Sequence, residues 1–488
     1  MKKNTTKIGA RSLTSNSLYY LLYEVLNVLF PFLTGMYVAR VLLPETVGMV
    51  EYARNITQYF VILAYLGIPT YGMREVAKAR DNREQLNRLY SELFCINLGS
   101  TAVFLAAYIG MVLAVDAFRA NIALYLVTGI SVAINAINIT YLYSGLEEFR
   151  FVSIRNIVFK ALCFVLLVLF VRGDGDYLVY ALITVVGTVG NYVINMLFSG
   201  RYVRFTTKNL CFRRHIRPIL VLVVVNLAIE LYSLVDTTML GIFCEEENVA
   251  YYSYAQKIQK ILLQIVNVFT MVLIPRISYY YQKGEIGSYN RLISKTLNIL
   301  ILLALPMIIG VWFVSDYVIV LLYTQAYISS ATILNLLLPL LLISPTGYLL
   351  GSRVLLATGH ENKMPISVCS GAAVNIALNA LLIPRYQEAG AAIASVVSEL
   401  LIMGIYIALG RRYFVLEDMR RDILKILCAC AVLAGVCYAC SCLPCAAFLI
   451  FAAQVACGVC AYFLALLLLR EAIVTQYFEK FIRRIRHG

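Results

Sequence analysis

Charged residues, histidine and tryptophan are all scarce in this sequence. Only 14% of its 488 residues are charged, it has three histidines and one tryptophan, and its mean hydropathy is +0.80. A typical soluble domain carries about 25% charged residues and is far less apolar. The composition therefore excludes an ordinary soluble domain and indicates an integral membrane protein.

Metal-ligating residues are poorly placed for a metal site. The three histidines lie far apart, and eight of the thirteen cysteines cluster between Cys428 and Cys460 without the spacing of zinc ligands. We interpret these cysteines as small packing residues. A disulfide among Cys440, Cys442 and Cys445 is the alternative. The sequence thus predicts no metal site and no bound cofactor.

Long polar stretches are missing, and apolar runs occupy most of the chain. A helix needs roughly 20 apolar residues to cross a hydrocarbon layer about 30 Å thick, and fourteen such runs are present. The expected spans are 18–40, 47–67, 92–114, 122–143, 151–171, 177–199, 218–242, 250–274, 292–314, 331–351, 365–383, 390–409, 423–440 and 446–469. The alternating segments that build a membrane β-barrel are not found. The predicted fold class is therefore all-α, with about 14 transmembrane helices.

The connections between these spans are short. The longest on the outer side, Ser315 to Ser330, has about sixteen residues, which leaves no room for a soluble catalytic domain. We therefore expect no catalytic residues.

Lysine and arginine are distributed very unevenly between alternate connections. With the N-terminus inside, the cytoplasmic segments carry 34 of the 41 cations and the outer segments carry four. This bias predicts that both termini are cytoplasmic. It also explains the net charge of +14 by topology and by attraction to an anionic inner leaflet, so we expect no nucleic-acid partner.

The chain contains an internal repeat. ETVGMVEYARNITQ from Glu45 aligns with ENVAYYSYAQKIQK from Glu247 at an offset of 202, and NRLYSE from Asn87 aligns with NRLISK from Asn290 at 203. Further matches follow in the same order. Spans 1–6 and 7–12 therefore read as two copies of one six-helix bundle.

An even number of spans per copy gives both copies the same orientation in the membrane. We expect two parallel six-helix pseudo-repeats around a central cavity, with the last two spans as an added helix pair. The predicted segments are 1–210, 211–412 and 413–488.

Each copy carries a polar stripe on its second helix. In the first copy, Glu51, Arg54, Asn55 and Gln58 are spaced i, i+3, i+4, i+7, which places them on one helical face. The repeat sets Ser253, Gln256, Lys257 and Lys260 at the same positions of the second copy. A lysine or arginine facing lipid at mid-span costs at least about 2.5–3.5 kcal/mol. We therefore predict that Arg54, Asn55, Gln58, Gln256, Lys257 and Lys260 line the cavity and bind an anion.

Simpler interpretations of the same residues remain open. Glu51 and Arg54 could form only an intrahelical ion pair, and Lys257 and Lys260 could extend to the membrane interface. Four carboxylates of the first, second and seventh spans are candidates for counter-charge or for coupling to H+ or Na+: Glu24, Glu51, Glu230 and Asp236.

Several segments resemble one transporter family. They are FPFLTGMYVARVLLPETVGMVEYARNITQYFVILAYLGIPTYGMREVAK, DTTMLGIF, IPRISYYYQKG, LLATGHENK and NALLIPRYQEAGAAIASVVSEL. From about Ser12 to Arg412 the chain is similar to the polysaccharide flippases of the Wzx type, which translocate O-antigen and capsule repeat units. Their superfamily, the multidrug/oligosaccharidyl-lipid/polysaccharide exporters, also includes the lipid II flippase and the multidrug-and-toxin extrusion carriers.

The resemblance implies a function and a location. It implies a flippase of the bacterial inner membrane that turns over undecaprenyl-diphosphate-linked oligosaccharide for surface polysaccharide such as lipopolysaccharide O-antigen or capsule. It assigns Arg54 as a cavity cation, whereas Lys257 and Lys260 depend on the internal repeat. Expected partners are the lipid-linked oligosaccharide, membrane lipids, the polysaccharide polymerase and the chain-length machinery. The alternatives are a cation-coupled drug exporter of the same superfamily and, less in keeping with the short outer loops, a membrane polymerase or ligase.

Overall fold

The architecture comes from a computed structural model that describes residues 29–271, 274–476 and 478–479. Within these residues every regular element is helical, as predicted. The chain divides into two compact units, Met1–Leu234 and Val235–Gly488. The predicted segment boundaries at residues 210 and 412 stay predictions.

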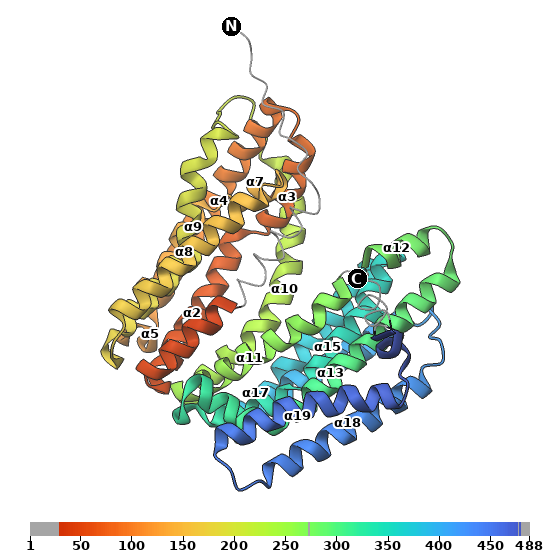
Figure 1. Cartoon of the computed structure of the whole chain (residues 1–488). Coiled ribbons are helices and arrows are strands. Elements are labelled where there is room, and N and C mark those ends of the chain that lie inside the picture. The colour runs from red at the N-terminus through yellow and green to blue at the C-terminus, as the bar shows by residue number, and fades with distance from the viewer. Residues whose placement is uncertain (1–28, 272–273, 477, 480–488) are drawn as a thin grey trace. The chain divides into compact units, whose positions relative to one another are not determined.

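Unit 1 contains the helices of the first copy. They are the apolar helix Leu29–Val41, α2 (Pro44–Tyr65), α3 (Ile68–Ala79), α4 (Arg83–Ala114), α5 (Asp116–Ala120), α6 (Ile122–Ile134), η1 (Asn135–Ile137), α7 (Thr140–Gly145), α8 (Phe149–Phe170), η2 (Asp174–Asp176), α9 (Tyr177–Phe198) and η3 (Ser199–Arg201) (Figure 1). The next helix, α10 (Arg213–Phe243), continues across the division into unit 2.

Unit 2 repeats this order and adds a helix pair. It contains α11 (Glu246–Met271), α12 (Ile274–Gln282), α13 (Ile286–Tyr323), η4 (Gln325–Tyr327), α14 (Ser329–Leu337), α15 (Leu340–Gly347), the π-helical η5 (Tyr348–Arg353), α16 (Val354–Ala357), η6 (Glu361–Lys363), α17 (Met364–Gly410), α18 (Arg420–Ser441) and α19 (Ala447–Leu468).

Helices occupy the described part of every predicted span, and eight of them are long and apolar enough to cross a membrane. The total of fourteen stays a prediction. Two helices extend well beyond their predicted spans: α13 continues to Tyr323, into the predicted outer loop, and α4 begins at Arg83 rather than near residue 92. The predicted spans 11 and 12 both lie in α17, which consists of two helices separated at Gln387, where the backbone angles are non-helical (φ 49°, ψ −131°).

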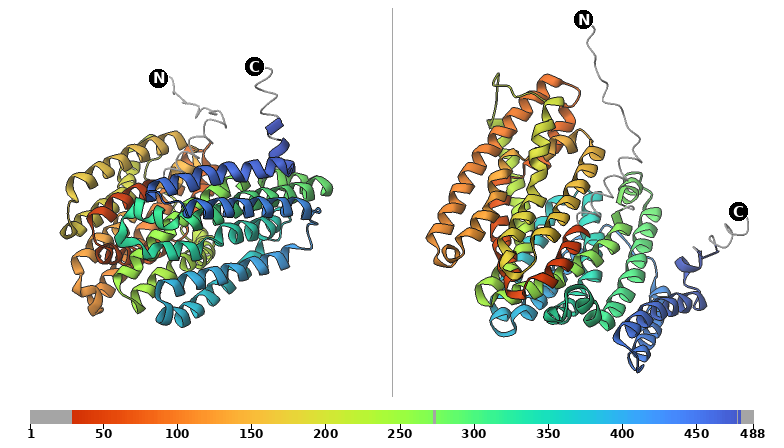
Figure 2. Two further views of the ribbon diagram at one scale, coloured as in Figure 1. Left: turned by 60° about the horizontal axis from the view of Figure 1, so that its bottom comes forward. Right: turned by 60° about the vertical axis from the view of Figure 1, so that its left-hand side comes forward.

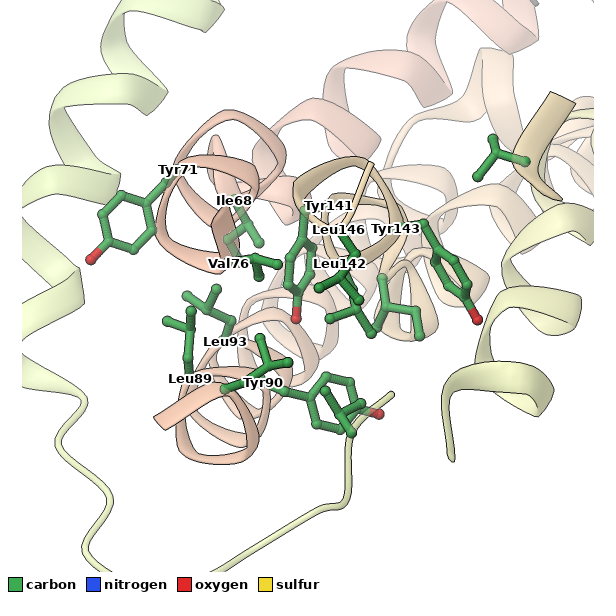
Figure 3. Close-up of a cluster of buried hydrophobic side chains, with 14 of the residues drawn as sticks. Ile68, Tyr71, Val76, Leu89, Tyr90, Leu93, Tyr141, Leu142, Tyr143 and Leu146 are labelled. Carbon is green, nitrogen blue, oxygen red and sulfur yellow. The ribbon is translucent and has the colours of Figure 1, made fainter. Parts of the chain in front are cut away.

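Matching apolar clusters lie around the short helices that follow α2 and α11. In unit 1, side chains of α3, α4 and α7 pack together, and Figure 3 shows the ring of Tyr71 at the edge of this cluster with its hydroxyl pointing away. In unit 2, residues of α12, α13 and η5 form the corresponding cluster. Each unit therefore has a core of its own.

The added pair α18–α19 packs on α13. The two helices lie side by side (Figure 2) and share a cluster with Leu302 of α13 that includes Cys430, Cys437 and Tyr462. The Tyr462 hydroxyl donates a hydrogen bond to the Leu302 carbonyl at 2.8 Å. Cys440, Cys442 and Cys445 are free thiols in the structure. The buried cysteines Cys430 and Cys437 thus serve as packing residues.

Glycines let α15–α16 approach the second half of α17 closely. A Cβ atom added at Gly351 would lie 2.1 Å from the Cβ of Tyr406, and one added at Gly410 would lie 2.3 Å from the Leu350 carbonyl oxygen. Small residues allow such backbone contacts between membrane helices. This packing fixes the π-helical turn against α17.

We predict that Gly351→Ala destabilises the protein by about 1–3 kcal/mol, because the added methyl overlaps the backbone-proximal atoms of Tyr406. The matched control is Gly404→Ala, since nothing lies within 4 Å of that added atom and alanine favours the helix. Thermal unfolding of the purified protein tests the pair. Equal melting temperatures for the two variants would contradict the packing account.

Candidate functional site

The helix that carries the first polar stripe, α2, is fixed at its start by a carboxylate. Pro44 occupies the first turn, and Asp174 of η2 accepts hydrogen bonds from the Leu43 backbone N–H at 2.8 Å and the Thr46 hydroxyl at 2.9 Å. A negative charge at a helix N-terminus is favourable because the helix dipole is positive there. Asp174 therefore ties α2 to the loop before α9.

Arg54 lies near the middle of α2 and is held by Glu51. Its Nη1 donates to both carboxylate oxygens of Glu51, at 3.3 and 3.2 Å. The Arg54 side chain remains 36% exposed while that of Glu51 is 12% exposed. Tyr180 of α9 is a further partner of the guanidinium. The intrahelical ion pair is thus present, and about one third of the Arg54 side chain remains exposed.

Asn55 and Gln58 do not share one environment. Asn55 is buried, and its amide donates to the Leu234 carbonyl of α10 at 3.1 Å. Gln58 is exposed. Asn55 therefore joins two helices, and of these two predicted site residues Gln58 is the one open to its surroundings.

The second stripe lies on α11, whose first turn is also bonded to a carboxylate. Asn248 donates to Glu388 at 2.5 Å, and Glu388 follows the irregular Gln387. Further along α11, the Lys257 ammonium lies 4.5 Å from the Tyr254 ring centroid. The exposed Lys260 donates to Gln256 at 2.8 Å. Both lysines have partners on their own helix, as Arg54 does.

Asp236 of α10 is at the centre of a buried polar cluster in unit 2. One carboxylate oxygen accepts hydrogen bonds from Asn375 at 3.1 Å and Asn379 at 2.7 Å. The other accepts from the Tyr252 hydroxyl at 2.6 Å and from the Ser395 hydroxyl. Asp236 is only 4% exposed. The sequence analysis identified Asp236 but none of these four donors, which come from α11 and both halves of α17.

The two remaining candidate carboxylates cannot be placed. Glu24 and the side chain of Glu230 lie outside the described part of the chain. Because each stripe is described within its own unit, the shared central cavity stays a prediction.

Two further cations lie in unit 1, inside the apolar span Val152–Phe170 of α8. Arg155 and Lys160 are both included in the 34 cytoplasmic cations counted from the sequence, although they fall within the predicted span 151–171. Arg155 donates to the amide oxygens of Asn191, at 3.2 Å, and Asn195 of α9. The Lys160 ammonium lies 5.7 Å from the ring centroid of Phe30. Asn191 and Asn195, spaced i, i+4 in an apolar helix, were the sequence signal for the Arg155 network.

Family models match much of the chain. The model described as "Polysaccharide biosynthesis protein" matches residues 13–281, more than half of the sequence. The model described as MatE matches residues 222–381.

Two curated proteins are similar in sequence. A protein of Escherichia coli (strain K12) named as an O-antigen transporter is 21% identical over 417 residues, which cover 84% of this chain and 98% of that protein. The low-salt glycan biosynthesis flippase Agl15 of Haloferax volcanii is 23% identical over 167 residues, covering 34% of this chain and 35% of that one.

Two solved structures share the fold. The lipid II flippase MurJ in an inward closed conformation has a TM-score of 0.73 at 13% identity, covering 94% of this chain and all of that chain. An inward-facing multidrug resistance transporter of the MATE family has a TM-score of 0.63 at 14% identity, covering 81% and 97%. At these identities the likeness establishes the fold alone.

We predict that Arg155→Met lowers the stability of the protein by about 1–3 kcal/mol, because it leaves the amide oxygens of Asn191 and Asn195 without their charged donor. Arg119→Met is the control, since Arg119 pairs with Asp116 on the exposed surface. Chemical or thermal unfolding of both variants measures the difference. A larger loss for Arg119→Met would contradict this assignment.

Proposed function

The chain belongs to the polysaccharide biosynthesis protein family, and from that membership we propose that it is a flippase for undecaprenyl-diphosphate-linked oligosaccharide repeat units. It moves them from the cytoplasmic to the outer leaflet of the bacterial inner membrane for surface polysaccharide such as O-antigen or capsule. The observation that carries this proposal is Arg54, a partly exposed arginine near the middle of an apolar helix.

The chemistry of Arg54 suits a diphosphate. A guanidinium presents paired N–H donors that match phosphate oxygens, and Glu51 holds this one in a fixed orientation. Lys257 and Lys260 supply point charges on the matching helix of unit 2. In the proposed cycle these cations bind the diphosphate, the sugars enter a polar cavity and the polyprenyl tail stays in lipid. Movement of one unit against the other then exposes the sugars outside.

No covalent chemistry is part of this cycle. The substrate leaves unchanged, so the protein acts as a transporter rather than as an enzyme. A polysaccharide polymerase and the chain-length machinery are the partners expected to take over the flipped units. Both termini are placed in the cytoplasm in this proposal.

Coupling to an ion is assigned to Asp236. Asp236 is a buried carboxylate that accepts four hydrogen bonds, and these bonds stabilise its charged form. In the proposed coupling, H+ or Na+ binds a carboxylate oxygen when one of these donors turns away. Glu51 is less suitable because its charge is already balanced by Arg54.

A second candidate function is cation-coupled drug export. The MatE match over residues 222–381 favours it. An exporter of cationic drugs needs carboxylates for capture and does not need Arg54. The two functions therefore differ in which partner of the Glu51–Arg54 pair is essential.

We predict that Arg54→Ala lowers flipping at least about tenfold, the effect of losing one charge-assisted hydrogen bond to phosphate. The measurement is the sidedness of the lipid-linked oligosaccharide in cells of the source organism that lack the gene and carry wild type or variant. Arg54→Lys keeps the charge and should retain more activity than Arg54→Ala at equal membrane level. Full activity of Arg54→Ala together with loss on Glu51→Gln would favour the exporter.

We predict that Asp236→Asn abolishes the dependence of transport on an H+ or Na+ gradient, because the amide keeps the size of the carboxylate but has no negative charge for a cation to neutralise and no site that takes up a proton near neutral pH. Transport into vesicles with imposed gradients tests this. Glu51→Gln is the comparison, and its ion dependence should persist. Unchanged gradient dependence in Asp236→Asn would remove Asp236 from the coupling role.

A further inference from the structure

The repeated motif Asn-Arg-Leu-X-Ser performs the same hydrogen bonding in both units. In unit 1, Asn87 and Ser91 of α4 accept hydrogen bonds from the backbone N–H groups of Arg204 and Thr206, at 2.7 and 2.8 Å. In unit 2, Asn290 and Ser294 of α13 accept from the backbone N–H groups of Val415 and Glu417, at 3.0 and 2.9 Å.

The spacing of the motif explains this match. Residues four apart on a helix are separated by about 6 Å along its axis, and alternate residues of an extended chain are separated by about 6.6 Å. An amide and a hydroxyl one turn apart can therefore receive two successive N–H groups from one side of an extended segment. Both docked segments lie outside helices, and both follow the last helix of their bundle.

In these four hydrogen bonds the docked segments contribute only backbone N–H groups. The residue types of the two segments can therefore differ between the copies. The sequences are VRFTT after α9 and FVLED after α17. Ser91 and Ser294 are buried, at 0% and 3% exposed, which shields both bonds from water.

The residue after the motif differs between the copies. Unit 1 has Glu92 and unit 2 has Lys295 at this position. Glu92 is fully buried and accepts hydrogen bonds from the Cys211 backbone N–H at 2.6 Å and from Arg214 at 2.5 Å. The His215 ring lies 2.8 Å from the same carboxylate, and its other nitrogen lies 2.7 Å from the Tyr71 hydroxyl.

These contacts lie at the start of α10, inside unit 1 and about twenty residues before the division at Leu234. Cys211, Arg214 and His215 border or begin α10, the helix that continues from unit 1 into unit 2. The hydroxyl of Tyr71 that points out of the core cluster in Figure 3 is the one bonded to His215. Glu92 thus connects the start of α10 to α4 and, through His215, to the core of unit 1.

We propose that each Asn-Arg-Leu-X-Ser motif is a docking site, here called a socket, for the segment that leaves its own bundle. In unit 1, Glu92 adds a second attachment, here called the lock, which binds the start of α10, the helix that continues into unit 2. The sockets hold both exit segments against the third helix of each bundle. The lock fixes the first turn of α10 to α4 within unit 1.

Hydrogen–deuterium exchange of the full-length protein in lipid nanodiscs tests this without reference to any transported substrate, so its failure would leave the proposed function untouched. Asn87→Ala with Ser91→Ala should accelerate exchange in residues 202–212 roughly fivefold, the scale of one lost hydrogen bond. Residues 413–419 should be unchanged. The matched variant Asn290→Ala with Ser294→Ala should show the reverse pattern.

Glu92→Gln tests the lock separately, since it keeps the shape and an acceptor oxygen but removes the charge that pairs with Arg214. It should accelerate exchange in residues 209–216 and leave residues 413–419 unchanged. If a double variant cannot be purified, Ser91→Ala alone must accelerate residues 202–212. Unchanged exchange in a variant's own segment, or equal acceleration of both segments, would overturn the proposal.

Discussion

The cost of placing a charge or a polar group in hydrocarbon is the constraint on which the rest of this structure depends. Arg54 is paired with Glu51 and Arg155 with two asparagines, while Lys257 stacks on a tyrosine. Asp236, the most buried acid near the stripes, is bonded to four donors. Each of these groups is satisfied by neighbours within its own unit. A binding site built from such groups can keep its shape while empty, because the side chains do not wait for the ligand to orient them.

The same constraint explains how the helices bearing the stripes are held. A carboxylate from the loop before the sixth helix of each bundle contacts the first turn of α2 or α11, through Asp174 or Glu388. At the opposite end of the bundle, the Asn-Arg-Leu-X-Ser motif binds the exit segment. Both units thus join their second, third and sixth helices by the same two kinds of bond. Each unit is consequently well suited to move as one body in the transport cycle proposed above.

The sequence predicted the helices and the repeat well, because hydropathy and self-similarity are properties of contiguous segments. It identified Arg54, Lys257 and Asp236 because a charged residue in an apolar run is conspicuous. It did not predict the Asp236 cluster, since Asn375, Asn379 and Ser395 are small polar residues more than one hundred positions away and common in membrane helices. It did not predict the Arg155 network, because a cation near the end of a span reads as part of the positive charge of the adjacent cytoplasmic loop. The span predicted for α13 ended too early because Ser315 and Asp316 interrupt its apolar run.

The difference between Glu92 and Lys295 also bears on the history of the chain. If both bundles descend from one ancestral gene, the motif that they share was present before the gene was duplicated. The ancestral bundle already had an exit segment for the motif to bind. An exit segment at the end of a single bundle can move without disturbing another part of the chain. A segment that connects two bundles passes its motion to both. On this view Glu92 arose after the duplication, in the first copy, where the exit segment leads into the second bundle.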